Sequence, residues 1–134
     1  MVLTQEQLEQ KLRYWQKRLR LQDWIIEVRL VRERELDGDY AAQVNWVLPK
    51  KMASVHILDQ IDYPPELMGE RDMENDLVHE LLHLHLAPIH EHFGEGNSLY
   101  SMFEEQAIES IAFGLVDAER NGDPHVSGGC PVTQ

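Results

Sequence analysis

The chain has 134 residues, the size of one domain, and carries 12 basic and 24 acidic side chains for a formal net charge of −12. Phosphate backbones select for Lys and Arg, so this excess of acid argues against general nucleic-acid binding. No apolar run approaches the roughly 18 residues that cross a bilayer, and the first residues lack the apolar core of a signal peptide. We therefore expect a soluble, cytoplasmic protein with one domain over residues 1–120 and a flexible tail over 121–134, without a membrane partner.

The first half of the chain is predicted to form a helix and three strands. Leu8, Leu12, Trp15 and Leu19 recur at helical spacing after a possible N-cap at Thr4, which predicts an amphipathic helix over residues 5–21. Alternating apolar residues predict a strand within DWIIEVRLVRE (23–33), and YAAQVNWVL (40–48) and MASVHILD (52–59) are two further candidates. The short connections favour a mainly antiparallel meander.

The second half is predicted to be helical. One helix runs from about residue 73 to residue 87, where Pro88 is expected to stop it. A loop containing HEHFGEGN follows, and a last helix runs from an N-cap at Asn97 or Ser98 to about residue 119. The predicted fold class is therefore α+β, with an N-terminal helix, a small three-stranded sheet and two C-terminal helices.

The stretch His-Glu-Leu-Leu-His (79–83) lies within the apolar segment LVHELLHLHLAP (77–88). A packed helix holds charged groups only where they are paired or bound to metal. Residues four apart share a helix face, so His79 and His83 can donate ring nitrogens to one metal ion. Glu80 lies about 100° further round and is free to act on a bound water. His85 lies about 160° from His83, so we interpret it as a core histidine or as one of a layer behind the site, and not as a ligand.

A catalytic zinc takes three protein ligands, so a third must come from elsewhere in the chain. Cys130, the only cysteine, lies in the Gly- and Pro-rich tail, and one thiol cannot build a cysteine metal site. The metzincin spacing requires Gly at position 86 and His at position 89, where this chain has Leu86 and Ile89. The remaining candidates are two loop histidines and two carboxylates near the start of the last helix: His90, His92, Glu104 and Glu105.

HELLH and the later EExxxE (104–109) together resemble the gluzincin metallopeptidases, and most closely the minimal, ImmA/IrrE-like or minigluzincin-like proteins of phages and prophages. The resemblance implies that a helix after the zinc helix presents a glutamate ligand, with a polar partner four positions later. On this basis Glu105 is the third zinc ligand, and Glu109 orients a zinc histidine, although the family usually has Asp or Asn at that position. It also implies that an edge strand pairs with an extended peptide, for which MASVHILD (52–59) is our candidate.

These features predict a zinc-dependent metalloendopeptidase that acts on a peptide or protein substrate. Glu80 is expected to be the general base, and Tyr100, His90 or His92 could stabilise the oxyanion. The alternative is a catalytically silent or latent zinc-binding domain that acts as a protein-interaction module. An open fourth metal position distinguishes an enzyme from such a module.

Overall fold

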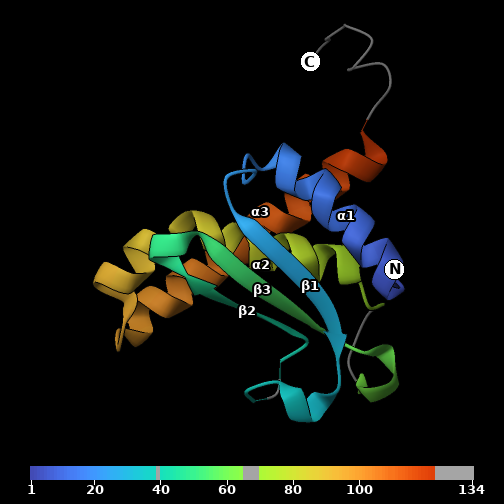
Figure 1. The fold of residues 1–134 in the computed structure, drawn as a ribbon, viewed down its shortest axis with the longest axis horizontal. Helices are drawn as coiled ribbons and strands as arrows, with labels where there is room; N and C mark the ends of the chain where they lie inside the picture. The colour runs from blue at the N-terminus through green and yellow to red at the C-terminus, as the bar shows by residue number, and fades with distance from the viewer. Residues whose placement is uncertain (39, 65–69, 123–134) are drawn as a thin grey trace, which may run out of the picture.

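The computed structural model describes residues 1–38, 40–64 and 70–122 (Figure 1). The main elements are α1 (Gln5–Arg18), β1 (Ile25–Val31), β2 (Ala42–Val47), β3 (Met52–Leu58), α2 (Met73–Ile89) and α3 (Ser98–Asn121). The predicted α+β class and order of elements are confirmed. Of the tail expected over 121–134, residues 123–134 lie outside the described residues, and Asn121 still belongs to α3.

The sheet has the order β1-β3-β2, with β3 antiparallel to β2 and parallel to β1. The expectation of an antiparallel meander is wrong in this respect. The tight turn after β2 folds β3 back between the two earlier strands, where its apolar residues Val55 and Ile57 are fully buried. The expectation that MASVHILD is an edge strand is therefore also wrong, because β3 is central and β2 is an edge strand.

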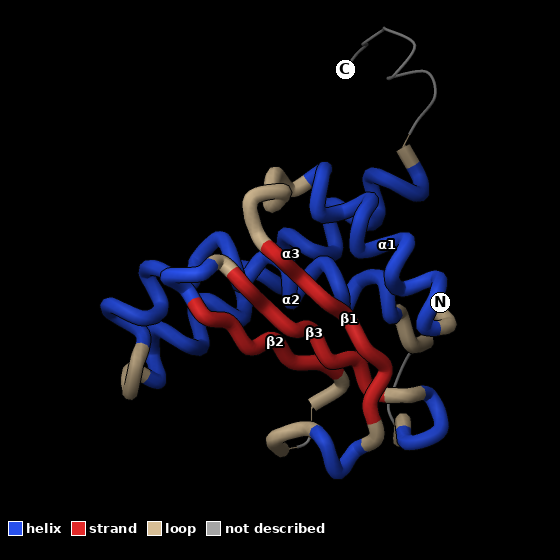
Figure 2. The backbone as a smooth tube through the Cα atoms, viewed as in Figure 1, coloured by secondary structure: helices blue, strands red, loops and turns tan. Residues whose placement is uncertain are grey.

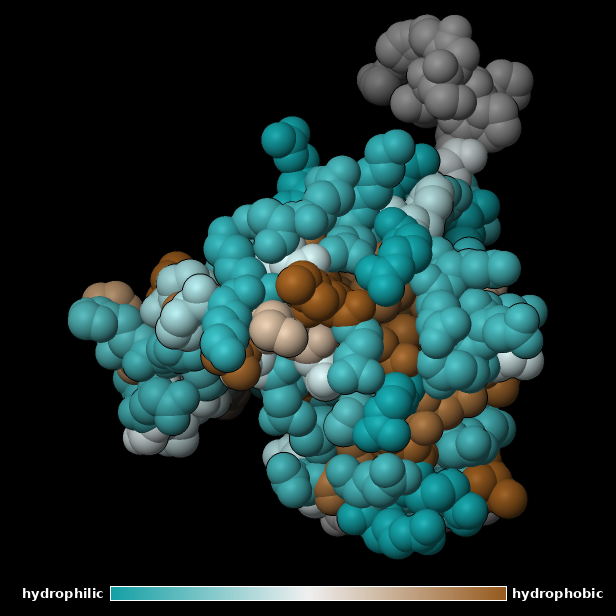
Figure 3. Space-filling view, viewed as in Figure 1, coloured by the Kyte–Doolittle hydropathy of each residue, from teal (hydrophilic) through white to brown (hydrophobic). Residues whose placement is uncertain are grey.

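All three helices lie on one face of the sheet, as Figures 1 and 2 show. Strand side chains alternate between two faces, and those that point toward the helices are buried, among them Ile26, Val28 and Ala53. The opposite face is open. Figure 3 views this side of the molecule, where apolar surface is bordered by hydrophilic side chains. Ile25 and Met52, which are paired in register and exposed, lie at one end of the open face.

Helix α1 begins at a capping box, in which the Thr4 side chain accepts a hydrogen bond from the Gln7 backbone and the Gln7 side chain accepts one from the Thr4 backbone. Its apolar stripe is buried at Leu8, Leu12 and Trp15. The helix ends at Arg18, earlier than the predicted residue 21. The chain reverses just afterwards at Arg20, whose φ of 62° lies in the left-handed region and cannot continue a helix.

Helix α2 is the most buried helix and carries the HELLH motif through the interior. Asp72 caps its N-terminus by accepting a hydrogen bond from the Asn75 backbone, and Leu77, Val78 and Leu81 are fully buried. The helix continues past Pro88 to Ile89, and a π-helical turn over His90–Gly94 follows. Pro88 therefore does not stop the helix where predicted. A proline in the last turn removes a single hydrogen bond, and the wider turn after it absorbs the distortion.

Candidate metal centre

The HELLH motif faces the groove between α2, α3 and the edge strand β2. At helical spacing, Asp76, His79, Glu80 and His83 lie on one stripe of α2, and all four line this groove. The opposite side of α2 is anchored in the core by Leu77, Val78, Leu81 and Leu84, which are at most 2 % exposed. The polar stripe is therefore held in place by a well-packed apolar one.

Three side chains from α2 and α3 converge in the groove. His79 Nε2 lies 3.0 Å from one carboxylate oxygen of Glu105, and His83 Nε2 lies 3.1 Å from the other. One ligand atom from each of the three residues lies within 4.8 Å of the other two. Among the described residues, this is the group of His, Cys, Asp and Glu side chains that can hold a metal ion.

Each histidine is also held from behind by a second carboxylate of α3. His79 Nδ1 lies 2.7 Å from Glu109, and His83 Nδ1 lies 2.6 Å from Glu104. Histidines that bind metals usually donate their second ring N–H to a carboxylate, which fixes the ring orientation. Here both Nδ1 atoms point outward to carboxylates and both Nε2 atoms point inward to Glu105. The two rings therefore have the orientation that metal binding through Nε2 requires.

Without a metal, the two imidazoles are favoured in their protonated form. Burial by itself lowers the pKa of His79, but the hydrogen bond to Glu105, the nearby charge of Glu80 and the hydrogen bond to Glu109 raise it to about 9. The pKa of His83 is likewise raised, because Glu105, Glu80 and Glu104 outweigh its burial. Hydrogen bonds from both histidines hold the pKa of Glu105 well below its usual range. A divalent cation can take the place of the two protons between the Nε2 atoms and Glu105.

Glu80 occupies a different environment from the other carboxylates. It is 8 % exposed, and no described residue donates a hydrogen bond to its side chain. Burial raises its pKa to about 7, against the opposing positive charges of His83 and His79. A carboxylate of this kind, unpaired and beside a candidate metal position, has the properties of a general base.

The other residues considered from the sequence are spread over different environments. His90 lines the groove, and its Nδ1 lies 3.3 Å from Glu104. His92 is exposed and packs against the ring of Phe93, and Tyr100 lies beside the ring of His90. The interpretation of His85 as a buried histidine is wrong, because its ring is exposed and contacts the Leu19 carbonyl oxygen at 2.7 Å after the end of α1.

The contact between Glu104 and His83 was not expected from the sequence. Glu104 is 5 % exposed and occupies the buried stripe that Ile108 and Ala112 continue at intervals of four residues. That spacing is visible in the sequence and could have identified Glu104 as a buried carboxylate, which requires a partner. Asp76 was likewise overlooked, although it precedes His79, Glu80 and His83 by three, four and seven residues.

Comparisons with protein-family models, curated proteins and solved structures gave no significant match. None of the helices over the described residues is both long and apolar enough to span a membrane.

Proposed function

We propose that this protein is a zinc-dependent metallopeptidase in which His79, His83 and Glu105 bind the metal and Glu80 is the general base. The observation that carries the proposal is the opposed pairing of the two imidazoles, with Nδ1 on the outer carboxylates and Nε2 on Glu105. Two imidazoles and one carboxylate form a common ligand set of catalytic zinc.

The number of ligands supports a catalytic centre over a structural one. Structural zinc sites have four protein ligands, whereas catalytic sites have three and keep one position for water or substrate. Within the ranges that the structure covers, the metal-binding group consists of three residues, and His90 is held instead by Glu104. This arrangement favours an enzyme over the alternative of a silent zinc-binding module.

The residues around the centre have separate roles in peptide hydrolysis. Zinc, when bound, lowers the pKa of a water and polarises a carbonyl group. Glu80 accepts the proton of the attacking water and passes it to the leaving amine. His90 lines the groove, unlike His92, and its ring is held at Nδ1 by Glu104, so we assign it the role of oxyanion donor.

The edge strand β2 offers a main-chain binding site for an extended peptide. The Leu58 backbone N–H donates to the Ala41 carbonyl, and these two residues are opposite each other in the antiparallel register. Hydrogen-bonded and non-hydrogen-bonded pairs alternate, so the backbone groups of Ala42, Val44 and Trp46 point away from β3, toward the free edge. These three residues also line the groove. We propose that the substrate adds to this edge as a further strand.

Metal-dependent cleavage of an unfolded polypeptide tests the proposal. The protein is stripped of metal, reloaded with one equivalent of zinc and incubated with a reduced, alkylated protein substrate. We expect new N-termini, identified by mass spectrometry, only in the zinc-loaded sample. Stoichiometric zinc binding without any cleavage would support the silent binding module instead.

A further inference from the structure

The groove is strongly acidic. Its lining beside the metal-binding group and in the adjoining hollow next to Trp46 includes six carboxylates and no Lys or Arg from the described residues: Asp76, Glu80, Glu91, Glu95, Glu105 and Glu109. One divalent ion offsets two of these six charges and leaves a net charge of −4 when all are ionised. A cleft lined by one sign of charge concentrates ligands of the opposite sign.

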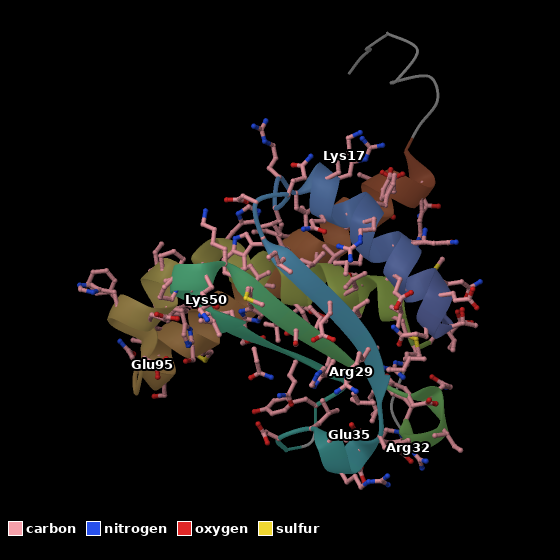
Figure 4. The ribbon with its side chains drawn as sticks, viewed as in Figure 1. Lys17, Arg29, Arg32, Glu35, Lys50 and Glu95 are labelled. Carbon is pink, nitrogen blue, oxygen red and sulfur yellow. The ribbon has the colours of Figure 1, made fainter. Side chains whose placement is uncertain are left out.

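The basic side chains that Figure 4 labels lie outside this lining. Lys50, in the turn after β2, is at the same end of the molecule as Glu95 but lines neither hollow, whereas Arg29 and Arg32 lie at the other end of the sheet and Lys17 lies on α1. Arg32 is already paired with Asp62 through two hydrogen bonds. Among the described residues, the lining of the groove itself therefore keeps its excess of acidic side chains.

Asp76 lines the groove, has no place in the metal centre and forms a loose ion pair with Arg71. Arg71 lies nearest to it, but the separation of 3.6 Å between Arg71 Nε and Asp76 Oδ2 is too long for a hydrogen bond. The Arg71 guanidinium instead donates to the Ala41 carbonyl and lies 4.5 Å from the centroid of the Tyr63 ring. Burial raises the pKa of Asp76 to about 6, against the charge of Arg71. A further cation beside Asp76 would stabilise its ionised form.

The surroundings of Asp76 match a basic side chain in two further respects. Glu109 lines the same part of the groove and disfavours the ionised form of Asp76 by its own charge. Tyr40, at the start of the edge-strand segment, is 60 % exposed and lines the groove as well. Carboxylates that can pair with a cation, together with an aromatic ring, are the groups that bind the ammonium or guanidinium of Lys or Arg.

The position of Asp76 along α2 places this subsite at a defined distance from the metal. The point midway between His79 and His83 is five residues further along the helix, or about 7.5 Å along its axis. An extended peptide advances about 3.3 Å per residue. A substrate side chain opposite Asp76 therefore belongs to a residue about two positions from the scissile bond.

We infer that the groove selects peptides with a Lys or Arg about two residues from the scissile bond, and that Asp76 is the residue that determines this specificity. The inference rests on the proposed function, since it names the substrate class of the same site. A chain with a net charge of −12 would in this way act on polypeptides of opposite charge.

Binding to a protein that does not hydrolyse the peptide separates specificity from activity. The probes are three fluorescein-labelled peptides that are identical except for Lys, Gln or Glu at both positions two residues from the central bond. Anisotropy is measured with zinc-loaded Glu80→Gln protein at 50 mM and 500 mM NaCl. We expect the Lys peptide to bind about tenfold more tightly than the Gln peptide at low salt. The preference should shrink at high salt, where charges are screened over a shorter distance.

The role of Asp76 is tested by adding Asp76→Asn to the same protein, which should reduce the preference for Lys by about fivefold. Asp76→Glu should preserve the preference, and Glu6→Gln, which removes an equal charge from the exposed face of α1, should leave it unchanged. Zinc content and circular dichroism confirm that each variant is loaded and folded. Equal binding of the Lys and Gln peptides, binding of none of them, or an unchanged preference in Asp76→Asn would overturn the inference.

Wild-type hydrolysis of the same peptides separates the two claims. A preference for Lys in binding without hydrolysis of any peptide would contradict the peptidase activity and uphold the specificity of the groove. Hydrolysis of all three peptides at equal kcat/KM, together with equal binding, would uphold the peptidase and overturn the inference.

Discussion

His83 Nδ1 lies 2.6 Å from a carboxylate oxygen of Glu104, and both side chains are almost fully buried. A buried carboxylate is stable only with a partner, and a buried imidazole keeps one orientation only if its N–H is accepted. Each group therefore satisfies the other and leaves His83 Nε2 facing Glu105. His79 has the same relationship with Glu109, except that Glu109 is 51 % exposed.

This difference in exposure predicts that replacing Glu104 weakens zinc binding more than replacing Glu109. Glu104→Gln keeps the shape of the side chain but removes its charge, and we expect the zinc affinity to fall by about 10- to 100-fold. Glu109→Gln should lower the zinc affinity by a smaller factor, because water can accept the hydrogen bond from the His79 N–H in place of the carboxylate. The affinities are measured by competition with a chromophoric chelator, with Glu6→Gln as the control. A larger effect of Glu109→Gln would contradict this account of the two carboxylates.

Zinc binding should release protons. In the metal-free protein the pKa of His79 is raised from 6.5 to about 9, so its imidazole is protonated at pH 7, and the pKa of His83 is also raised, which favours its protonated form. Metal binding through Nε2 displaces these protons, so we expect a release of about one to two protons per zinc. Titration calorimetry in buffers with different ionisation enthalpies measures this number. A release near zero at pH 7 would mean that both histidines are already neutral without metal.

The same pKa shift makes the stability of the metal-free fold depend on pH. A histidine whose pKa is higher in the folded state stabilises the fold when it is protonated. The contribution of His79 is therefore fully present below about pH 6.5 and is lost as the pH rises through about 9. Urea unfolding of the zinc-free protein should show a falling free energy of unfolding over this range, and the decline should be smaller in His79→Gln, where the contribution of His83 remains. A decline of equal size in that variant would assign the effect to other groups.

The free edge of β2 can be tested with proline. Val44→Pro removes an N–H that points toward the groove, and proline is tolerated on edge strands where that N–H is not paired. We expect a folded protein whose KM for a peptide rises about fivefold, the effect of one lost hydrogen bond. Val44→Ala shortens the same side chain but keeps the N–H, so its KM should stay near that of the wild type.

Asn45→Pro is the matched contrast, because it removes an N–H paired with β3 and should lower the free energy of unfolding by about 3 kcal/mol. A Val44→Pro protein with wild-type KM would contradict binding of the peptide at this edge.

Another buried carboxylate, in the first turn of α2, joins the three helices. Glu74 is 1 % exposed, accepts a hydrogen bond of 2.7 Å from the Trp15 indole and pairs with Arg120 at 2.9 Å. Arg120 also donates two hydrogen bonds to Asp72, the N-cap of α2. Arg120→Met should lower the free energy of unfolding by about 2 kcal/mol, because Glu74 stays buried and loses a charged partner. Arg34→Met, on the exposed turn after β1, is the control. Equal urea midpoints for Arg120→Met and Arg34→Met would contradict a stabilising role for the pair of Arg120 and Glu74.

The local features of this protein could be read from its sequence, because they depend on spacing along a single helix. The interval of four residues puts His79 and His83 on one face of α2, and the interval between Glu105 and Glu109 lets both reach His79. The apolar spacing that predicted α1 corresponds to its buried stripe. Each of these features follows from the helical period alone.

Features that depend on contacts distant in the sequence could not be read in the same way. No local signal shows that β3 folds between β1 and β2, because strand order is decided by which pairs bury the most apolar surface. The helical spacing correctly placed His85 on a different side of α2 from His83. Only the tertiary structure shows that this side of α2 faces the end of α1 and solvent. The choice between Glu104 and Glu105 depends on the rotation of α3 against α2, which places Glu105 between the two Nε2 atoms.

The central claim is that Glu80 acts on a metal-activated water, and the most direct measurement compares wild-type and Glu80→Gln proteins for zinc content and peptide hydrolysis in the same samples. General-base catalysis contributes about 100-fold or more. We predict one zinc per chain in both proteins and a loss of at least about 100-fold in kcat for the variant. A zinc-loaded Glu80→Gln protein that retains wild-type kcat would contradict this account of the site.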